Sequence, residues 1–417
     1  MNKLVIQGGK ELSGEIHIGG AKNSVVALIP ASILTSGKCV IKNVPDISDV
    51  HALIEIMEVL GSKINYHDEI MEIDNSNVKN TLIKEEYTTK LRASYYFMAS
   101  LLGRFKKAEI AYPGGCVIGS RPIDFTLKSF EKMGVNIKES DGRYSMKAPK
   151  LSGTEIFFDV PSVGATINCM ISGVLAKGTT KILNAAREPE IVNIADFLKS
   201  MGAKIEGAGT GTITVTGVEK LGDGEVTVIP DRIEAGTYII IGSLLGKNLK
   251  VTGIIEEHIK SLLYKLKEAG ANYKIVGNSV VLNKTKKLKA INIKTTVYPG
   301  FPTDLGQPMS TFLTQCEGES IFEETIYENR LRHIPHLVAM GAHINTFEKK
   351  AVITGATKLH GNKVKATDLR AGASMLVAGL IADRVTSISN IEHLLRGYER
   401  IVDKLNGVGA SIQFTDK

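Results

Sequence analysis

A short glycine motif recurs six times along this chain of 417 residues. In each copy an apolar residue or Ala precedes Gly, and a small residue, any residue, and Ile or Tyr follow it, as in Leu60-Gly61-Ser62-Lys63-Ile64. The motif glycines lie 68 to 73 residues apart and are Gly61, Gly134, Gly202, Gly270, Gly341 and Gly409. Because repetition at a nearly constant period indicates duplication of one structural unit, the chain is predicted to contain six related units of about 70 residues.

Each unit is predicted to be an α/β element. The glycine follows a segment with helical periodicity, such as residues 188–201, and supplies a left-handed C-terminal cap. The Ile or Tyr after it begins a strand, a second strand follows a turn, and then an apolar helix rich in small residues begins. These helices are expected to be buried, and they start near Lys22, Lys90, Ser162, Asp231, Thr303 and Asp368.

The two ends of the chain complement each other. After Gly409 the last copy stops at residues 412–414, whereas residues 3–18 resemble the hairpin that it lacks. The N-terminal strands are therefore expected to complete the C-terminal unit, and six units then divide into three and three. This predicts one domain at 22–229, which carries the Cys116 loop, a second at 1–21 and 230–417, and a hinge near 20–22 and 229–231. A single six-unit solenoid is the alternative.

Composition excludes several classes of protein. Hydrophobic residues make up 43% and charged residues 23%, as in soluble globular proteins. No apolar run approaches the ~20 residues of a membrane span, and no signal peptide is visible, so a cytoplasmic location is expected. The net charge of +7 favours anionic partners, but without a basic run or Trp, nucleic acid is not expected. The four cysteines form no CxxC pair, so neither a metal site nor a disulfide framework is predicted.

Charged residues at the starts of the apolar helices suggest anion binding. Helix N-termini carry free N–H groups and partial positive charge, which bind phosphate and carboxylate. Helix capping accounts for Ser162 and Asp231. It does not account for Lys22 and Arg370, because a cation in the first turn opposes the helix dipole. These two residues are therefore predicted to hold an anion.

Cys116 is the candidate reactive cysteine. It lies in the Gly-rich segment 113–122, five residues before Arg121, and a nearby guanidinium favours the thiolate. Cys39, Cys169 and Cys316 lie in apolar runs or near a helix end and are expected to be packing residues. Taken alone, a single loop cysteine is more often structural or incidental than catalytic.

Eight segments spread over nearly the whole chain match the motifs of one known family. They are Gly19-Gly20-Ala21-Lys22-Asn23, the Gly-Gly-Cys116 loop to Asp124, 161–166, 184–190, Phe301-Pro302-Thr303-Asp304, Glu328-Asn329-Arg330, Asp368-Leu369-Arg370-Ala371 and 396–400. In these segments the chain resembles the UDP-N-acetylglucosamine enolpyruvyl transferase family. The resemblance implies two domains, each a pseudo-threefold inside-out α/β barrel. It also implies transfer of enolpyruvyl from phosphoenolpyruvate to the 3′-hydroxyl of UDP-N-acetylglucosamine, with release of phosphate, as the first committed step of peptidoglycan synthesis. No cofactor is implied.

The resemblance also implies roles for individual residues. Cys116 would donate a proton and form an adduct with phosphoenolpyruvate. Asp304 would act as general base on the attacking hydroxyl, or take a proton in a later step. Phosphate and carboxylate groups would be held by Lys22, Arg121, Arg370 and Arg396. The sugar-nucleotide site would be lined or supported by Asn23, Arg92, Arg121, Pro122, Ile123, Asp124, Phe125, Ser162, Val163, Gly164, Asp304, Ile326, Tyr327, Arg330 and Asp368. Domain closure would bring the Cys116 loop over the site and exclude water.

The chain departs from some family members at three positions. Val160, Thr126 and Tyr96 stand where those members carry Lys, His and Trp, which affects individual nucleotide contacts. Members with Asp in place of the cysteine resist fosfomycin, so this antibiotic is expected to alkylate Cys116. Two other functions remain open. The shikimate-pathway enolpyruvyl transferase lacks the Gly-Gly-Cys loop, and a catalytically silent sugar-nucleotide-binding paralogue would be favoured by loss of a catalytic residue.

Overall fold

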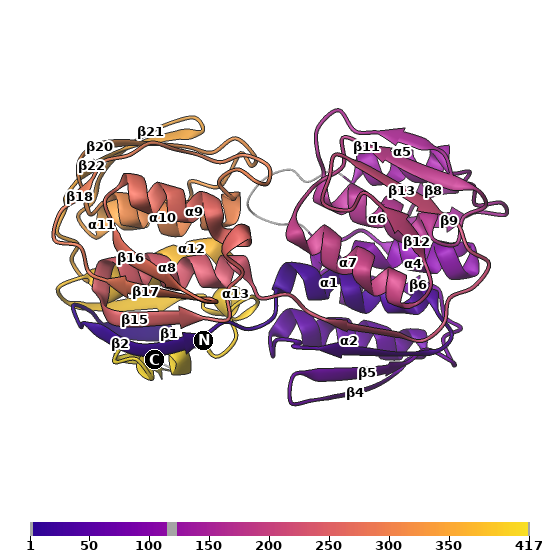
Figure 1. The fold of residues 1–417 in the computed structure, drawn as a ribbon, viewed down its shortest axis with the longest axis horizontal. Coiled ribbons are helices and arrows are strands. Elements are labelled where there is room, and N and C mark those ends of the chain that lie inside the picture. The colour runs from indigo at the N-terminus through magenta and orange to yellow at the C-terminus, as the bar shows by residue number, and fades with distance from the viewer. Residues whose placement is uncertain (1–2, 115–122, 416–417) are drawn as a thin grey trace. The chain divides into compact units, whose positions relative to one another are not determined.

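The computed structural model describes residues 3–114 and 123–415, which form two compact units, each with its own hydrophobic core. Residues 20–114 and 123–229 form the inserted unit, and residues 3–19 and 230–415 form the terminal unit. The chain passes from one unit to the other at residues 19–20 and 229–230 (Figure 1). Within the described residues, no helix has the length and apolar character needed to cross a membrane.

Three four-stranded sheets form the β structure of the described part of the inserted unit. In each sheet the first strand runs parallel to the second, and the remaining neighbours are antiparallel. In spatial order the sheets are β14 (Gly224–Thr227), β3 (Lys38–Lys42), β5 (Ile70–Asp74), β4 (Lys63–His67); β6 (Leu82–Ile83), β7 (Lys107–Ala111), β9 (Arg143–Lys147), β8 (Asn136–Ser140); and β10 (Glu155–Phe157), β11 (Thr179–Leu183), β13 (Thr212–Thr216), β12 (Lys204–Glu206).

The terminal unit repeats this arrangement three times in its described residues. In spatial order its sheets are β2 (Leu12–His17), β15 (Gly246–Thr252), β17 (Ser279–Asn283), β16 (Asn272–Val276); β18 (Leu288–Lys289), β20 (Cys316–Glu323), β22 (Lys350–Gly355), β21 (His343–Phe347); and β23 (Lys363–Lys365), β24 (Val385–Ser389), β1 (Lys3–Gln7), β25 (Ile412–Thr415). In the second of these sheets β19 (Ile293–Lys294) also pairs with β20. Six related sheets confirm the six repeats.

The N-terminal strands join two different sheets. β1 lies between β24 and β25, with Leu4 opposite Ile388 and Ile6 opposite Ile412, so it completes the C-terminal unit as expected. β2 instead pairs with β15 in the fourth repeat, so the expectation that both strands complete the last unit is wrong for β2. Elsewhere the strand before a buried helix pairs with the strand after that helix, as β6 does with β7. At the two crossings these partners are exchanged: β2 pairs with β15, and β14 pairs with β3.

The apolar helices lie in the interior of each unit, enclosed by the sheets (Figure 1). They are α1 (Lys22–Ala31), α4 (Tyr96–Phe105) and α6 (Val163–Gly173) in the inserted unit, and α8 (Arg232–Leu245), α10 (Thr303–Leu313) and α12 (Leu369–Ile381) in the terminal unit. All residues of α8 after Arg232 are buried. The helix expected near Lys90 begins as a 3₁₀ turn, η2 (Arg92–Tyr95), which continues into α4.

The remaining α-helices each expose part of their surface to solvent. They are α2 (Ser48–Leu60), α3 (Glu85–Thr88), α5 (Asp124–Lys132), α7 (Pro189–Ser200), α9 (Glu256–Glu268), α11 (Ile334–Ala339), α13 (Glu392–Leu395) and α14 (Ile401–Asn406). A 3₁₀ turn, η1 (Ser32–Leu34), follows α1. All six motif glycines have positive φ, between 81° and 109°, where residues other than glycine are strained. Gly61 shows their role: it ends α2 and donates its N–H to the carbonyl of Met57.

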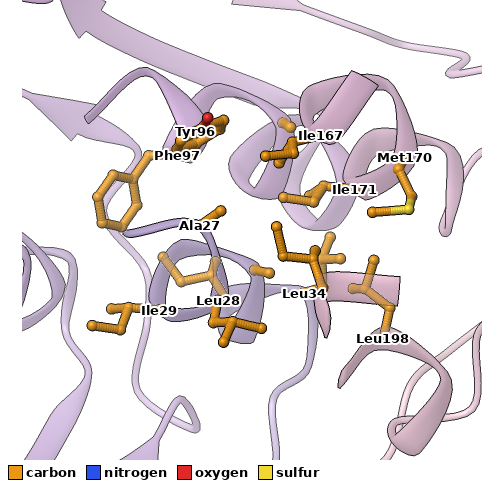
Figure 2. Packing of buried hydrophobic residues seen from close by; sticks show 14 of the residues in the cluster. Ala27, Leu28, Ile29, Leu34, Tyr96, Phe97, Ile167, Met170, Ile171 and Leu198 are labelled. Carbon is orange, nitrogen blue, oxygen red and sulfur yellow. The ribbon is translucent and has the colours of Figure 1, made fainter. Parts of the chain in front are cut away.

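Side chains from α1, α4 and α6 meet in the core of the inserted unit (Figure 2). Leu28, Phe97 and Ile171 are each 0% exposed. Burying a side chain of this size stabilises the fold by about 1.5–3 kcal/mol relative to leaving it in water. The apolar bodies of the interior helices therefore fix them in the core, and the polar residues of their first turns are available to form binding sites.

Candidate functional site

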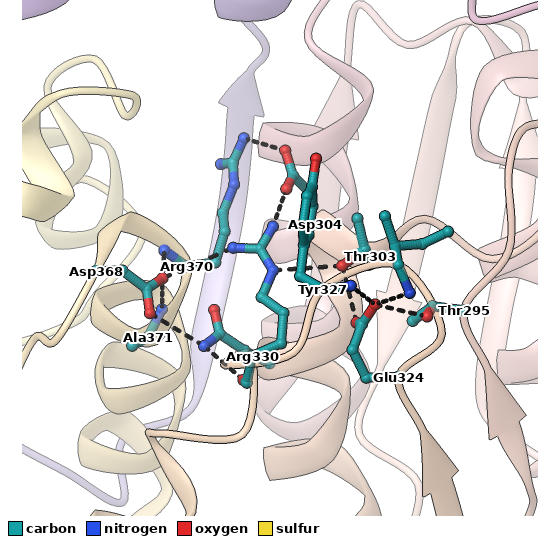
Figure 3. Close-up of polar contacts among 11 residues, drawn as sticks. Thr295, Thr303, Asp304, Glu324, Tyr327, Arg330, Asp368, Arg370 and Ala371 are labelled. Carbon is teal, nitrogen blue, oxygen red and sulfur yellow. Dashed lines mark hydrogen bonds and ion pairs between the residues drawn. The ribbon is translucent and has the colours of Figure 1, made fainter. Parts of the chain in front are cut away.

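Two arginines and a carboxylate meet at the starts of α10 and α12 in the terminal unit (Figure 3). Asp304 lies in the first turn of α10 and forms a short ion pair with Arg330. Its other oxygen, Oδ2, lies 3.0 Å from Nη2 of Arg370 in the first turn of α12. The side chains of Arg330 and Arg370 are 4% and 3% exposed, whereas that of Asp304 is 23% exposed. Asp304 is therefore the member of this cluster that solvent or a ligand reaches most easily.

Arg370 is fixed from several directions. Asp368 caps α12, and its Oδ1 accepts hydrogen bonds from the backbone N–H groups of Arg370 and Ala371 at 2.9 and 3.0 Å. The Arg370 guanidinium also lies 5.5 Å from the ring centroid of Tyr398, within cation–π distance. Burial alone would lower the pKa of Arg370, but Asp304, Tyr398 and Asp231 together outweigh this effect, so the pKa is raised. Arg370 is thus a permanent cation at a helix N-terminus.

Arg330 connects the two helix starts. Its Nη1 lies 3.8 Å from Oδ1 of Asp368, and its Nε donates a hydrogen bond to Oγ1 of Thr303 at 3.3 Å. Gln307 adds a further link, since its Nε2 donates to Oδ2 of Asp368 at 3.3 Å and to the carbonyl of Arg330 at 2.9 Å. The predicted residues Asp304, Arg330, Asp368 and Arg370 therefore form one connected network.

The turn after β20 carries two more predicted residues. The backbone N–H groups of Ile326 and Tyr327 donate to Oε1 of the buried Glu324 at 2.7 and 3.2 Å. The Tyr327 ring centroid lies 5.4 Å from the Arg330 guanidinium, which joins this turn to the network. Arg396 directly follows α13, is half-buried, and stands two residues before Tyr398.

In the inserted unit, Lys22 is the first residue of α1, with Asn23 next to it. Its Nζ lies 3.1 Å from Oδ2 of Asp49, a residue in the first turn of α2, and the two side chains are 15% and 3% exposed. Asp49 therefore supplies a negative charge that offsets the unfavourable placement of a cation at a helix N-terminus. A bound anion would share the ammonium group with this carboxylate.

The start of α6 contacts the segment that holds Arg92. The Ser162 hydroxyl accepts a hydrogen bond from the N–H of Ala165 at 3.3 Å, which confirms its capping role. Val163 and Gly164 form the first turn of α6, and the Tyr95 hydroxyl lies so close to Gly164 that a Cβ there would be 1.7 Å from it. Arg92 and Tyr95 belong to the same turn, η2. The absence of a side chain at residue 164 thus allows these two segments to meet.

The start of α5 holds the remaining predicted residues that the structure describes. Ile123 precedes the helix, and Asp124 in its first turn lies 3.8 Å from Nζ of Lys128. Phe125 packs against Phe158, with ring centroids 5.9 Å apart. Cys116, Arg121 and Pro122 lie outside the described residues, so their roles remain predictions.

The other three cysteines are packing residues, as expected. Cys39, Cys169 and Cys316 are buried, and burial raises the pKa of each thiol to about 12. Each is therefore a neutral thiol at physiological pH. Among residues 3–114 and 123–415, no group of three or more His, Cys, Asp and Glu side chains could hold a metal ion.

Sequence reasoning missed three residues of the terminal-unit network. Glu324 and Gln307 were not singled out, although Glu324 lies only four residues before the Glu328-Asn329-Arg330 motif. Tyr398 lies inside the matching segment 396–400 but received no role. The available signal for Glu324 was its place two residues after Phe322, in the alternation of β20 that buries Ser320 and Phe322. No comparable signal marked Gln307, because its partners are 23 and 61 residues away.

Comparison with known proteins places the chain in a family. Residues 6–405 match the family EPSP synthase (3-phosphoshikimate 1-carboxyvinyltransferase). The chain is 49% identical, over 100% of both chains, to UDP-N-acetylglucosamine 1-carboxyvinyltransferase 2 of Streptococcus pyogenes serotype M1. It is also 49% identical to the protein of that name from Bacillus cereus, with 99% of this chain and 96% of the relative covered.

A solved structure gives the same result for the fold. The crystal structure of the enolpyruvyl transferase NikO from Streptomyces tendae matches with a TM-score of 0.90 at 27% identity and covers 99% of both chains. This similarity confirms the predicted two-domain enolpyruvyl transferase fold. The chain therefore belongs to the EPSP synthase family of enolpyruvyl transferases.

Proposed function

We propose that this protein transfers the enolpyruvyl group of phosphoenolpyruvate to the 3′-hydroxyl of UDP-N-acetylglucosamine and releases phosphate. The observation that carries the proposal is the 49% identity over the whole chain to a protein named UDP-N-acetylglucosamine 1-carboxyvinyltransferase 2. The reaction would be the first committed step of peptidoglycan synthesis and would take place in the cytoplasm. It requires two anionic substrates and no cofactor.

Asp304 suits the role of general base for the sugar hydroxyl. It is the most exposed group of its cluster, and two guanidinium groups fix its orientation. A carboxylate in ion pairs is a weak base, because its negative charge is already stabilised. An arriving substrate anion would compete for Arg330 or Arg370 and so make Asp304 a stronger base at the moment when it is needed.

The cations suit phosphoenolpyruvate, which carries a phosphate and a carboxylate. Lys22, Arg121, Arg370 and Arg396 would bind these groups and stabilise the charge that develops during reaction. In the addition step the C2–C3 double bond of phosphoenolpyruvate opens, the 3′-oxygen bonds to C2, Asp304 takes the hydroxyl proton and Cys116 supplies a proton to C3. In the elimination step C3 returns a proton to the Cys116 thiolate, the C2–C3 double bond re-forms and the bond from C2 to the phosphate oxygen breaks. Enolpyruvyl stays on the sugar, and the departing phosphate takes the proton from Asp304.

The sugar nucleotide would be held mainly by backbone and polar groups at the helix starts. In the inserted unit these are Asn23, Arg92, the residues 123–125 that open α5, and the residues 162–164 that open α6. In the terminal unit Ile326 and Tyr327 would contribute from the turn after β20, while Arg330 and Asp368 support Asp304 and Arg370. Helix N-termini of this kind favour the negatively charged diphosphate.

Phosphate release from phosphoenolpyruvate tests the proposal. Release is expected only with UDP-N-acetylglucosamine present, and it should fall sharply in a Cys116→Ser variant. Cys316→Ser is the matched control, because its hydroxyl can donate to the Phe312 carbonyl that lies 3.6 Å from the Cys316 sulfur. Release with 3-phosphoshikimate as the acceptor instead would assign the other transferase reaction. Binding of the sugar nucleotide without any release would identify a silent paralogue.

A further inference from the structure

Glu324 is a buried carboxylate whose hydrogen bonds connect three segments of the terminal unit. It directly follows β20 and is 1% exposed. Its Oε1 accepts hydrogen bonds from the Thr295 hydroxyl at 3.0 Å and from the backbone N–H groups of Ile326 and Tyr327. Its Oε2 accepts one from the Thr303 hydroxyl at 2.8 Å (Figure 3). These four donors offset the cost of burying a charge.

The bond to Thr303 extends this arrangement to Asp304 and Arg330. Thr303 is the first residue of α10 and immediately precedes Asp304. Its hydroxyl hydrogen points to Glu324, which leaves a lone pair on the oxygen to accept from Nε of Arg330 at 3.3 Å. Arg330 in turn pairs with Asp304. Glu324 thus determines which way the Thr303 hydroxyl is oriented, and that orientation holds Arg330.

We propose that Glu324 is a positioning residue that holds the turn 325–327 and the Asp304–Arg330 pair in one fixed arrangement. The inference rests on the proposed function, in which Ile326 and Tyr327 bind the sugar nucleotide whose hydroxyl Asp304 deprotonates. A single carboxylate would then align the nucleotide contact with the base. Three of the four donors meet Oε1 and the fourth meets Oε2. A side chain therefore needs two acceptor atoms to satisfy all four donors.

Glu324→Gln separates the two halves of this function. The amide oxygen can keep the three donors that now meet Oε1, so the turn 325–327 stays in place. The amide nitrogen then faces Thr303, whose oxygen receives two donors while its own hydrogen loses its acceptor. Arg330 competes with the new amide for that oxygen, so the Asp304–Arg330 pair is loosened while the nucleotide contact is preserved.

Steady-state kinetics with phosphoenolpyruvate and UDP-N-acetylglucosamine test the proposal. In Glu324→Gln, kcat is expected to fall about tenfold, the effect of one lost hydrogen bond to a charged group, and KM for the sugar nucleotide should change less than about twofold. Thr303→Val should give the same pattern, and the double variant should lose no more than either single variant. Glu324→Ala removes the support of the turn as well, so KM should also rise about tenfold.

Glu323→Gln is the matched control. Glu323 is the preceding residue, but its carboxylate pairs with Lys294 and Lys350 at 3.5 and 3.8 Å on the partly exposed side of the sheet. This variant should keep wild-type kcat and KM. A melting temperature for each variant establishes that it is folded, and if Glu324→Gln does not fold, the kcat of Thr303→Val decides the question.

The outcomes separate this inference from the proposed function. A wild-type protein that shows no turnover with these substrates contradicts the proposed function. An active wild type with an unchanged kcat in Glu324→Gln overturns the positioning role. The positioning role is also overturned if the fold-losses in kcat of Glu324→Gln and Thr303→Val multiply in the double variant. Multiplication would mean that the two side chains act independently and not through one hydrogen bond.

Discussion

Replacing Gly164 by Ala should destabilise the protein through a single contact. A Cβ at this position would lie 1.7 Å from the hydroxyl oxygen of Tyr95 and 2.9 Å from its Cζ. Because non-bonded carbon atoms prefer separations of about 3.5–4.0 Å, the Tyr95 ring would have to move by about 2 Å. The ring is stacked on Tyr96, with centroids 4.5 Å apart, so this movement disturbs a packed pair.

The size of the effect follows from two opposing terms. Overpacking of this kind costs about 1–3 kcal/mol, and replacing Gly by Ala in a helix returns up to about 1 kcal/mol. The expected net loss is about 1–2 kcal/mol, which lowers the melting temperature by about 2–8 °C for a unit of this size. Since Gly164 lies at the start of α6, KM for UDP-N-acetylglucosamine should rise as well.

Calorimetry of four variants tests this reasoning. Tyr95→Phe removes the clashing oxygen, so in the Gly164→Ala background it should recover more than half of the lost stability. Gly222→Ala is the control, because the nearest atom to its added Cβ is a carbonyl oxygen 3.8 Å away. Equal melting temperatures for Gly164→Ala and Gly222→Ala would refute the argument. The same conclusion follows if Tyr95→Phe has an identical effect with and without the alanine.

Three further predictions concern charge and reactivity. Asp304→Asn leaves Arg330 and Arg370 without the carboxylate that they share, so kcat should fall about 10²–10⁴-fold in the phosphate-release assay while Asp383→Asn has little effect. Fosfomycin and iodoacetamide should each label the native protein once, at Cys116, by intact-mass analysis, because the other three thiols are buried with pKa values of about 12; labelling of a buried cysteine would contradict this. Burial lowers the pKa of His333 from 6.5 to about 4. As pH falls, this histidine is protonated in the unfolded chain before it is protonated in the folded one, so about 3 kcal/mol of stability should be lost between pH 6.5 and pH 4. Urea unfolding at pH 7 and pH 4.5 measures that loss, and it should shrink in His333→Gln.

The repeat made most of the fold predictable from the sequence. Local signals were sufficient wherever a structure depends on residues that are close in the chain. The motif glycines end helices because a positive φ is required at one position. The interior helices are buried because apolar and small residues make up most of their bodies. The exchange of β2 and β14 between repeats could not be predicted from local sequence, because the hydrophobic pattern of each strand is the same whichever sheet it joins.

The candidate site was predictable in part for the same reason. Positions at helix starts, such as Asp304 and Arg370, could be located from the helix boundaries and the family motifs. Their partners could not, because Asp304 meets residues 26 and 66 positions away. Lys22 was predicted to hold an anion, and the structure places Asp49 beside it. Glu324 escaped notice because its importance lies in four hydrogen bonds that exist only after folding.

The N-terminal strands β1 and β2 pair with strands from the second half of the chain, and this determines the order in which the protein folds as it leaves the ribosome. Every strand of the inserted unit lies between residues 38 and 227, so that unit can close while the second half of the chain is still being translated. β2 must wait for β15, and β1 must wait for residues 385–388 and 412–415. At about 5–20 residues per second the first strand made stays unpaired for tens of seconds. During that time Leu4 and Ile6, which are fully buried in the finished protein, are exposed on the nascent chain.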